Sequence, residues 1–251
     1  MKDLKNKGIG TKAIHGGVIK NKYGALATPI YQTSTFVFKN VEEGAKRFLG
    51  EEEGYIYSRL SNPTLTVAEE KVAILENGEK SLATSSGMGA ISATLWTLLK
   101  AGDHVLADKT LYGCTYAYIS HGLTKFGVEV DFVDMSDLEE VKIKLKDNTK
   151  VIYLETPANP NLKIVDIQKI SELSHNKNSN IKVVVDNTFA TPFCQNPLLL
   201  GADIVVHSAT KYLNGHGDVI AGFVVGSQEM INDIRTVGSV SYTHLTLPTI
   251  C

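Results

Sequence analysis

Residues 203–217 of the chain read DIVVHSATKYLNGHG. The apolar run Ile204-Val205-Val206 predicts a strand that is buried on both faces, as the strands of parallel sheets are. Ser208, Thr210 and Lys211 would then emerge at the carboxyl end of this strand, where open α/β sheets bind ligands. Partial desolvation there favours the neutral, nucleophilic amine of a lysine. A lone Thr-Lys pair is usually part of a surface loop, so the interpretation of Lys211 as a reactive amine depends on the rest of the chain.

Helical and strand patterns alternate along most of the chain. The patterns predict strands at 80–84, 104–107, 128–133, 151–154, 182–185, 204–206 and 222–226, and helices near 65–77, 88–99, 114–125, 137–145, 166–175 and 228–237. This alternation indicates an α/β fold with a mostly parallel sheet that is covered by helices. Residues 1–60 show little periodicity and many turn formers. We therefore expect an extended amino-terminal arm at 1–60 and a large domain at 61–239.

Composition restricts the class of partner. The 251 residues carry a formal net charge of −2 without a basic cluster, which argues against binding to nucleic acid or to a membrane surface. The amino terminus lacks a signal-peptide pattern, and no apolar run approaches the ~20 residues of a membrane span. We expect a cytoplasmic protein that acts on a small molecule. Cys114, Cys194 and Cys251 lie too far apart for a zinc site or a disulfide framework, so no metal is expected.

Polar residues at the predicted strand ends match the needs of pyridoxal phosphate, which are an amine, a carboxylate, a flat aromatic ring and an anion cradle. Lys211 would supply the amine. Asp186 follows the apolar strand 182–185 and would pair with the ring nitrogen, although an isolated Asp-Asn pair is more often a turn or a helix cap. Tyr112 follows the strand 104–107 and can stack on a planar ligand, although many tyrosines in such places are core residues.

A serine- and glycine-rich turn between a predicted strand and helix supplies the anion cradle. Backbone amides of Ser86, Gly87 and Met88 would form a helix-start anion site. The dinucleotide glycine fingerprint and the Gly-Lys-Ser/Thr nucleotide motif are both missing, so a nucleotide-binding α/β module is a weak alternative. Further candidate phosphate donors lie outside this turn: Ser208, Thr210, Tyr57 and Arg59.

The segment 203–217 resembles the lysine signature of the Cys/Met-metabolism family of pyridoxal-phosphate-dependent enzymes. Other segments are similar to the same family, namely 11–17 (TKAIHGG), 29–36 (PIYQTSTF), 57–64 (YSRLSNPT) and 155–160 (ETPANP). The resemblance covers residues from about 10 to 238. It implies the type I fold of PLP-dependent transferases, with a seven-stranded sheet, and pyridoxal 5'-phosphate as cofactor.

The resemblance also implies roles for individual residues. Lys211 would form the Schiff base with the cofactor and later remove the α-proton of the substrate. Tyr112 would be the acid for the leaving group, and Arg59 nearby would favour its phenolate form in the resting enzyme. Asn159 would hydrogen-bond the phenolic oxygen of the cofactor. The phosphate would be held by Gly87, Met88, Ser208 and Thr210, and by Tyr57 and Arg59 of a neighbouring subunit. A homodimer or homotetramer with shared sites is therefore expected.

Within this family, Cys114 beside Tyr112 is typical of members that eliminate methanethiol from L-methionine, which yields 2-oxobutyrate and ammonia. Members that make or cleave cystathionine usually carry glycine there. Cys114 is therefore assigned to the catalytic site, although a small buried thiol chosen for packing is an equal alternative. Cystathionine γ-lyase and O-acetylhomoserine sulfhydrylase activities remain the alternatives within the family.

The carboxyl-terminal part of the sequence departs from the family pattern. Family members continue into a smaller carboxyl-terminal domain, which carries the arginine that binds the substrate α-carboxylate. Residues 240–251 (VSYTHLTLPTIC) match neither the family nor an α/β unit. We expect a truncated chain with a tail that is not native, without the small domain, and with little or no lyase activity of its own. A non-catalytic fragment that binds PLP is the alternative of another functional class.

Overall fold

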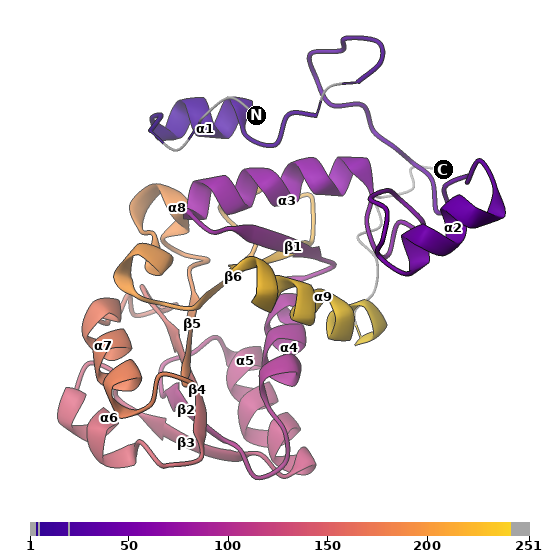
Figure 1. Cartoon of the computed structure of the whole chain (residues 1–251). Helices are drawn as coiled ribbons and strands as arrows, with labels where there is room; N and C mark the ends of the chain where they lie inside the picture. The colour runs from indigo at the N-terminus through magenta and orange to yellow at the C-terminus, as the bar shows by residue number, and fades with distance from the viewer. Residues whose placement is uncertain (1–3, 5, 20, 242–251) are drawn as a thin grey trace.

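The computed structural model of the chain describes residues 4, 6–19 and 21–241 (Figure 1). The described strands are β1 (Lys80–Thr84), β2 (His104–Asp108), β3 (Glu129–Val133), β4 (Thr149–Glu155), β5 (Lys182–Asp186), β6 (Ile204–Ser208) and β7 (Gly222–Gly226). They form one seven-stranded sheet in the order β1-β7-β6-β5-β4-β2-β3. Strand β7 runs antiparallel to both β1 and β6, whereas the pairs from β6 to β3 are parallel. The predicted α/β fold with a mostly parallel sheet is confirmed.

Helices connect the strands and cover both faces of the sheet (Figure 1). They are α1 (Ile9–His15), α2 (Val41–Phe48), α3 (Pro63–Glu76), α4 (Gly87–Leu98), α5 (Gly113–Ala117), α6 (Leu138–Lys144), α7 (Ile167–Lys177), α8 (Thr191–Cys194) and α9 (Gln228–Ser241). One π-helical turn, η1 (Tyr118–Gly122), and two 3-10 turns, η2 (Leu123–Phe126) and η3 (Pro197–Leu200), complete the series. The single helix predicted at 114–125 is thus divided among α5, η1 and η2. Gly122 within this segment lowers its preference for a regular α-helix.

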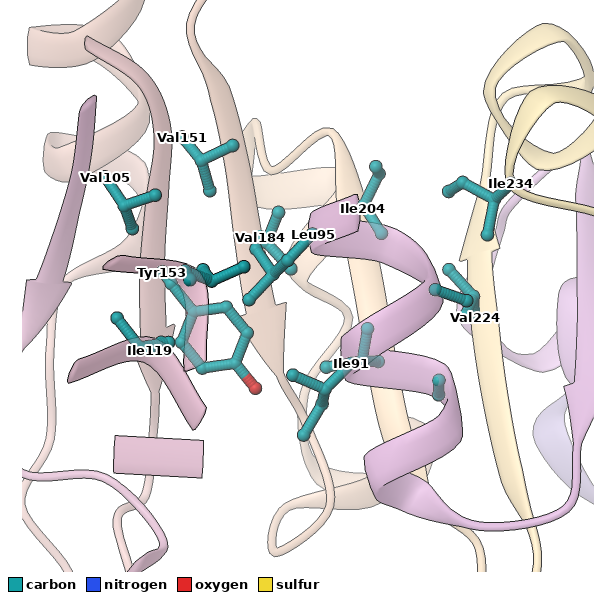
Figure 2. Close-up of a cluster of buried hydrophobic side chains, with 14 of the residues drawn as sticks. Ile91, Leu95, Val105, Ile119, Val151, Tyr153, Val184, Ile204, Val224 and Ile234 are labelled. Atoms are coloured by element: carbon teal, nitrogen blue, oxygen red, sulfur yellow. The ribbon is translucent and has the colours of Figure 1, made fainter. Parts of the chain in front are cut away.

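The hydrophobic core has two layers because successive residues of each strand point to opposite faces of the sheet. In β4, Val151 and Tyr153 join a cluster with Ile91 and Leu95 of α4. Figure 2 shows this layer between α4 and the strands. On the other face, Ile152 and the next apolar residues of β4 and β5 pack against α6 and α7. Each fully buried aliphatic side chain stabilises the fold by about 1.5–3 kcal/mol.

At one edge of the sheet, side chains bind backbone groups of strand β1. Glu69 of α3 accepts a hydrogen bond from the backbone N–H of Ala83 at 2.9 Å. Arg235 of α9 donates to the carbonyl of Ser81 at 3.3 Å and to Glu69 Oε2 at 2.8 Å. Unpaired backbone groups on an edge strand promote pairing with other chains. The Glu69–Arg235 ion pair satisfies some of these groups and joins α3, β1 and α9.

The amino-terminal arm is less extended than the sequence predicts, because α1 and α2 lie within it. Asn40 caps α2 by accepting the N–H of Glu43 at 2.8 Å, and the carboxylate of Glu43 accepts the N–H of Lys39. The arrangement differs from a capping box, because Glu43 binds the N–H of the residue before the N-cap and not that of Asn40 itself. The sequence Asn40-Val41-Glu42-Glu43 nevertheless carried a signal for the start of a helix. Large apolar side chains of the arm remain exposed, including those of Leu26 and Val37.

Helix α9 continues to Ser241 and so includes the first two residues of the segment 240–251 that the sequence sets apart. Residues 242–251 lie outside the described part of the chain, and the interpretation of the tail as non-native stays a prediction, as does the division at residues 60 and 239. None of the helices in the described residues combines the length and the apolar character that a membrane crossing needs.

Candidate active site

The carboxyl ends of β4, β5 and β6 bring together residues that are distant in the sequence. The register of the sheet places Glu155 opposite Asp186, and Asp186 opposite Val206. Ser208 ends β6 two residues further on, and the N–H of Lys211 donates to its carbonyl at 3.2 Å. The expectation that Asp186 and Lys211 share one edge of the sheet is therefore met.

Asp186 is a buried carboxylate with several donors around it. It accepts hydrogen bonds from the N–H and the hydroxyl of Thr188, at 3.0 and 2.5 Å, and from the hydroxyl of Tyr153 at 3.4 Å. Burial nevertheless raises the pKa of the Asp186 carboxyl above its usual range. A cationic partner would favour the ionised form of this group. Asp186 thus fits the role of a partner for a protonated ring nitrogen.

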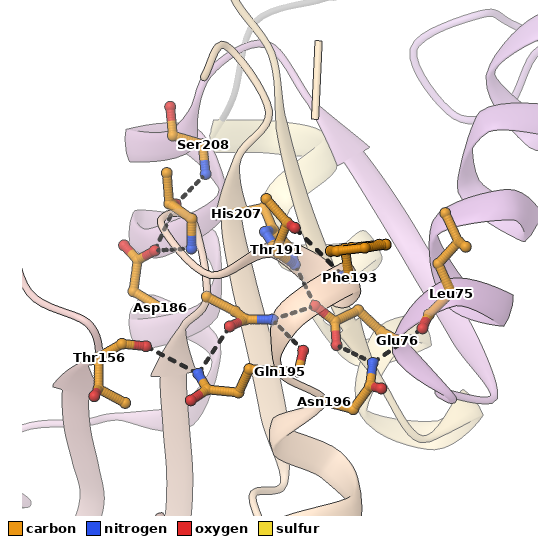
Figure 3. Close-up of polar contacts among 12 residues, drawn as sticks. Leu75, Glu76, Thr156, Asp186, Thr191, Phe193, Gln195, Asn196, His207 and Ser208 are labelled. Carbon is orange, nitrogen blue, oxygen red and sulfur yellow. Dashed lines mark hydrogen bonds and ion pairs between the residues drawn. The ribbon is translucent and has the colours of Figure 1, made fainter. Parts of the chain in front are cut away.

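Thr188 connects Asp186 to the end of β6. Its hydroxyl donates to Asp186 and accepts the N–H of Ser208 at 2.8 Å (Figure 3). The sequence reasoning did not single out Thr188. Its signal was the spacing Asp-x-Thr after an apolar strand, which allows the aspartate to bind the backbone N–H two residues on.

The amino end of α4 lies against Ser208 and forms an anion cradle. Ser86 caps the helix by accepting the N–H of Gly89 at 3.0 Å. A Cβ atom on Gly87 would lie 2.6 Å from the Cβ of Ser208, so the close approach requires glycine. The first N–H groups of a helix have no partner within the helix and attract anions. Gly87 and Met88 therefore present donors beside the Ser208 hydroxyl, which suits a phosphate group.

The lysine loop is more open than the sequence predicts. Lys211 is exposed to solvent in the structure. The partial desolvation that the sequence predicts for its amine is therefore not observed. The loop extends past the end of β6, and residues 211, 212 and 215–218 in it are exposed. The hydroxyl of Thr210 exchanges hydrogen bonds with the backbone of Ala221, at 3.1 and 3.3 Å. Thr210 therefore fastens the loop to the start of β7.

Glu155 is a further buried carboxylate at this edge that the sequence reasoning missed. Its two oxygens accept the N–H groups of Tyr112 and Asn159, at 2.8 and 3.1 Å. Burial and the neighbouring Asp186 raise the pKa of Glu155 to about 7. The sequence could not indicate this arrangement, because Tyr112 lies 43 positions away from Glu155. Both Tyr112 and Asn159, which the sequence assigned to the cofactor, are thereby placed near the strand ends.

Tyr112 and Cys114 lie together on the open side of the site. The Cys114 thiol donates to the Tyr112 hydroxyl at 3.5 Å, and the side chain of Tyr112 is 47% exposed. This hydrogen bond and the neighbouring thiol raise the pKa of the Tyr112 phenol. This rise of the Tyr112 pKa is opposite to the effect expected from Arg59. Within the chain, Arg59 donates to the carbonyl of Ser239 at 2.7 Å.

Tyr57 and Arg59 are not brought to the strand ends of the same chain. The guanidinium of Arg59 lies 5.6 Å from the centre of the Tyr57 ring and binds α9 through Ser239. Arg235 of α9 in turn donates to the carbonyl of Leu60 at 3.0 Å. These contacts hold the segment 57–60 against α9. A role for Tyr57 and Arg59 in a neighbouring subunit stays a prediction.

A buried polar network lies beneath the site and joins α3 to the sheet (Figure 3). His207 of β6 is 2.6 Å from Glu76 through Nε2, and both side chains are fully buried. The amide of Asn187 donates to Glu76 at 2.7 Å, and Gln195 donates to Asn187 at 2.9 Å. Asn187 follows Asp186 directly, so the network supports the turn that carries Asp186 and Thr188. His207, which sequence analysis left as a structural residue, belongs to this buried network through Glu76.

A family model described as Cys/Met metabolism PLP-dependent enzyme matches residues 10–243. The chain belongs to this family. The L-methionine gamma-lyase of Fusobacterium nucleatum subsp. nucleatum is 67% identical to the chain over 236 residues, which are 94% of the chain and 60% of that relative. The chain thus spans about 60% of the length of this curated relative. The resemblance on which the sequence interpretation depends is confirmed.

Solved structures with 37–42% sequence identity share the fold. The metB structure from Corynebacterium glutamicum is 42% identical with a TM-score of 0.89, and the match covers 95% of the chain and 60% of that structure. A putative O-acetylhomoserine (thiol)-lyase from Campylobacter jejuni is 37% identical with a TM-score of 0.85, over 91% of the chain and 55% of that structure. The latter carries a pyridoxyl-lysine phosphate at its position 205.

Proposed function

We propose that the protein catalyses the PLP-dependent γ-elimination of L-methionine to methanethiol, 2-oxobutyrate and ammonia, with one water consumed. The observation that carries this proposal is the 67% identity to an L-methionine gamma-lyase over 94% of the chain. It is supported by the cluster of Asp186, Ser208 and the amino end of α4 at one edge of the sheet, which fits the cofactor.

When bound, pyridoxal phosphate supplies an aldehyde that captures an amine and a ring that stabilises negative charge on the substrate carbons. Asp186 would keep the ring nitrogen protonated. The N–H groups at the start of α4 and the hydroxyl of Ser208 would bind the phosphate, and Thr210 would order the loop that carries them. Asn159 would donate to the phenolic oxygen of the ring, and Lys211 would bind the aldehyde and transfer protons at the substrate carbons.

Tyr112 suits the role of acid for the leaving sulfur. A general acid must hold its proton until the bond breaks, and the raised pKa of the Tyr112 phenol favours the protonated form at neutral pH. The thiol of Cys114 lies 3.5 Å from the phenol oxygen, where it would contact the leaving group. This placement supports a role for Cys114 in the choice of sulfur substrate.

Two alternatives concern the substrate within the same family. An O-acetylhomoserine sulfhydrylase reaction has support from the Campylobacter jejuni structure, at a lower identity of 37%. A cystathionine γ-lyase reaction would use the same Tyr112 acid with a larger leaving thiol. Cys114 is the residue that favours the methionine reaction over these two alternatives. A non-catalytic, PLP-binding protein is the alternative of another class.

The proposed protein is a cytoplasmic homodimer or homotetramer. The arm supports this assembly because it exposes large apolar side chains, among them Leu26, Val37 and Val41, and contiguous apolar surfaces often mark protein interfaces. Tyr57 and Arg59 would then reach the phosphate in the site of a neighbouring subunit.

The proposal is tested by release of 2-oxobutyrate and methanethiol from L-methionine, compared with cystathionine and with O-acetylhomoserine plus sulfide. We expect the highest kcat/KM for L-methionine. A protein that develops the visible absorption of a lysine-bound cofactor but turns over none of these substrates would support the non-catalytic alternative. Higher kcat/KM for cystathionine would overturn the assignment of the substrate.

A further inference from the structure

We propose that Glu155 is a positioning residue that holds both Tyr112 and Asn159 in place against the cofactor. The proposal rests on the proposed function, because it assigns Tyr112 and Asn159 to contacts with pyridoxal phosphate. Glu155 itself is buried behind these two residues and acts through them.

One carboxylate anchors two separate loops. Glu155 is the last residue of β4, and its Oε2 accepts the N–H of Tyr112 at 2.8 Å while its Oε1 accepts the N–H of Asn159 at 3.1 Å. Tyr112 precedes α5, in the loop after β2, and Asn159 lies in the loop after β4. Each oxygen therefore fixes one loop, and the rigid strand fixes the distance between the two loops.

The anchor is needed because neither side chain is held by packing. Tyr112 and Asn159 are both exposed on the open side of the site. The direction of an exposed side chain depends on its backbone, and here a charge-assisted hydrogen bond holds each backbone N–H. Without this anchor, both loops would keep their approximate positions, but the side chains of Tyr112 and Asn159 would take a wider range of positions.

The location of Glu155 is unfavourable for an ionised carboxylate, which points to a role other than stabilisation of the fold. It lies in register with Asp186, so two buried carboxylates share the same edge of the sheet. Burial and the charge of Asp186 raise the pKa of Glu155 to about 7. Glutamine at this position would avoid the repulsion but would present its NH₂ group to one of the two N–H donors. A carboxylate can accept both hydrogen bonds, whereas an amide oxygen can face one loop at a time.

The test compares Glu155→Gln with Glu69→Gln in the protein loaded with pyridoxal phosphate. Glu69 is a matched control, because it is also buried and also accepts a backbone N–H, that of Ala83. In Glu155→Gln we expect the dissociation constant of pyridoxal phosphate to rise by about tenfold, the effect of one lost hydrogen bond to a charged group. We also expect the pH midpoint of the visible absorption band to move upward by at least about half a unit, since Asn159 no longer favours the ionised phenolic oxygen.

A double-mutant cycle separates positioning from general damage. Asn159→Ala removes the side chain but keeps the N–H bond to Glu155, and it should cause a similar shift of the absorption midpoint. The effects of Glu155→Gln and Asn159→Ala should then be clearly non-additive, because the first acts through the second. If Glu155→Gln does not fold, Glu155→Asp replaces it in the same double-mutant cycle.

Three results would overturn the inference. These are an unchanged absorption midpoint in Glu155→Gln, equal shifts in Glu155→Gln and Glu69→Gln, or strictly additive effects in the cycle. Absence of the visible band in the wild-type protein would instead contradict the proposed function. The two failures are therefore distinguishable.

Discussion

The strand-end site and the amino-terminal arm are built in opposite ways. At the strand ends, Asp186, Glu155 and Ser208 are fixed by the register of the sheet and by hydrogen bonds within the chain. In the arm, polar residues such as Arg59 bind the nearby helix α9, and large apolar side chains face outward. The chain thus orders the strand-end residues of the proposed cofactor site by itself, whereas the contributions proposed for the arm require a second copy.

The largest expected effect is that of Lys211→Ala. We expect loss of the visible absorption of the lysine-bound cofactor and loss of all lyase activity, because the amine that follows β6 is removed. Lys163 is the control, since it is a second lysine near strand ends but pairs with Asp108 and Asp134. Borohydride reduction and peptide mapping should place the pyridoxyl label on Lys211. Recovery of the label on Lys163 would contradict the assignment.

Asp186→Ala should have the next largest effect and should exceed that of Asp203→Ala. Loss of the carboxylate beside the ring nitrogen should raise the reaction barrier by at least about 3 kcal/mol, as removal of other single electrostatic groups does. Asp203 pairs with Lys182 and His175 at the start of β6, so its loss should reduce stability more than kcat. Steady-state kinetics and thermal unfolding of both variants measure the difference. Equal losses of kcat would show that Asp186 has no special role.

Glu155→Gln should change how stability depends on pH. The pKa of Glu155 is raised from 4.5 to about 7 in the folded protein, so the folded state binds the proton more tightly than the unfolded state. The stabilisation is fully present below pH 4.5 and is lost as the pH rises through 7, by about 3 kcal/mol in total. Unfolding by urea between pH 4 and 8 should show this decrease in the wild type and a smaller decrease in Glu155→Gln. Parallel pH profiles would exclude the raised pKa.

Much of the fold was predictable because its strands are continuous apolar runs. Runs such as Val183-Val184-Val185 indicate the positions of the strands, and the segments between the runs indicate the helices that alternate with them. The placement of Asp186 and Ser208 at one edge of the sheet was predictable because the carboxyl ends of parallel strands meet there, and their roles in binding a cofactor stay predictions. Thr188 and Glu155 were missed because their roles depend on hydrogen bonds across loops, and the pairing of Glu155 with Tyr112 spans 43 positions.

The arm was predicted less well. The start of its helix α2 is set by the N-cap Asn40 and by Glu43, which binds the N–H of Lys39, a local signal within a segment that otherwise lacks periodicity. The exposure of Lys211 was not predictable from the buried strand before it, because the loop leaves the sheet directly after Ser208. Local pattern thus indicates where a strand ends but not how far the next residues are covered.

Arg59→Ala should weaken the binding of pyridoxal phosphate by about 2 kcal/mol, the typical contribution of a hydrogen bond to a charged group. Arg47→Ala is the control in the arm, because Arg47 binds Glu43 and the carbonyl of Tyr55. Equilibrium dialysis measures the affinity of both variants for pyridoxal phosphate. The sharper experiment mixes Arg59→Ala with Lys211→Ala subunits, since a shared site predicts that hybrid oligomers regain one intact site. Failure to regain activity in hybrids would place Arg59 outside the neighbouring site.

Cys114→Gly should have the smallest effect, a change in preference rather than in cofactor binding. Removal of the thiol frees space beside the Tyr112 hydroxyl and should shift the ratio of kcat/KM for L-methionine and cystathionine by about 1 kcal/mol toward cystathionine. Cys194 on α8, the other exposed cysteine of the described residues, provides the control Cys194→Gly, which should leave the ratio unchanged. The pKa of Tyr112 should fall in Cys114→Gly, because the thiol that raises it is absent. If neither the ratio of kcat/KM for the two substrates nor the pKa of Tyr112 changes, Cys114 is a residue of the protein surface without a role in substrate choice.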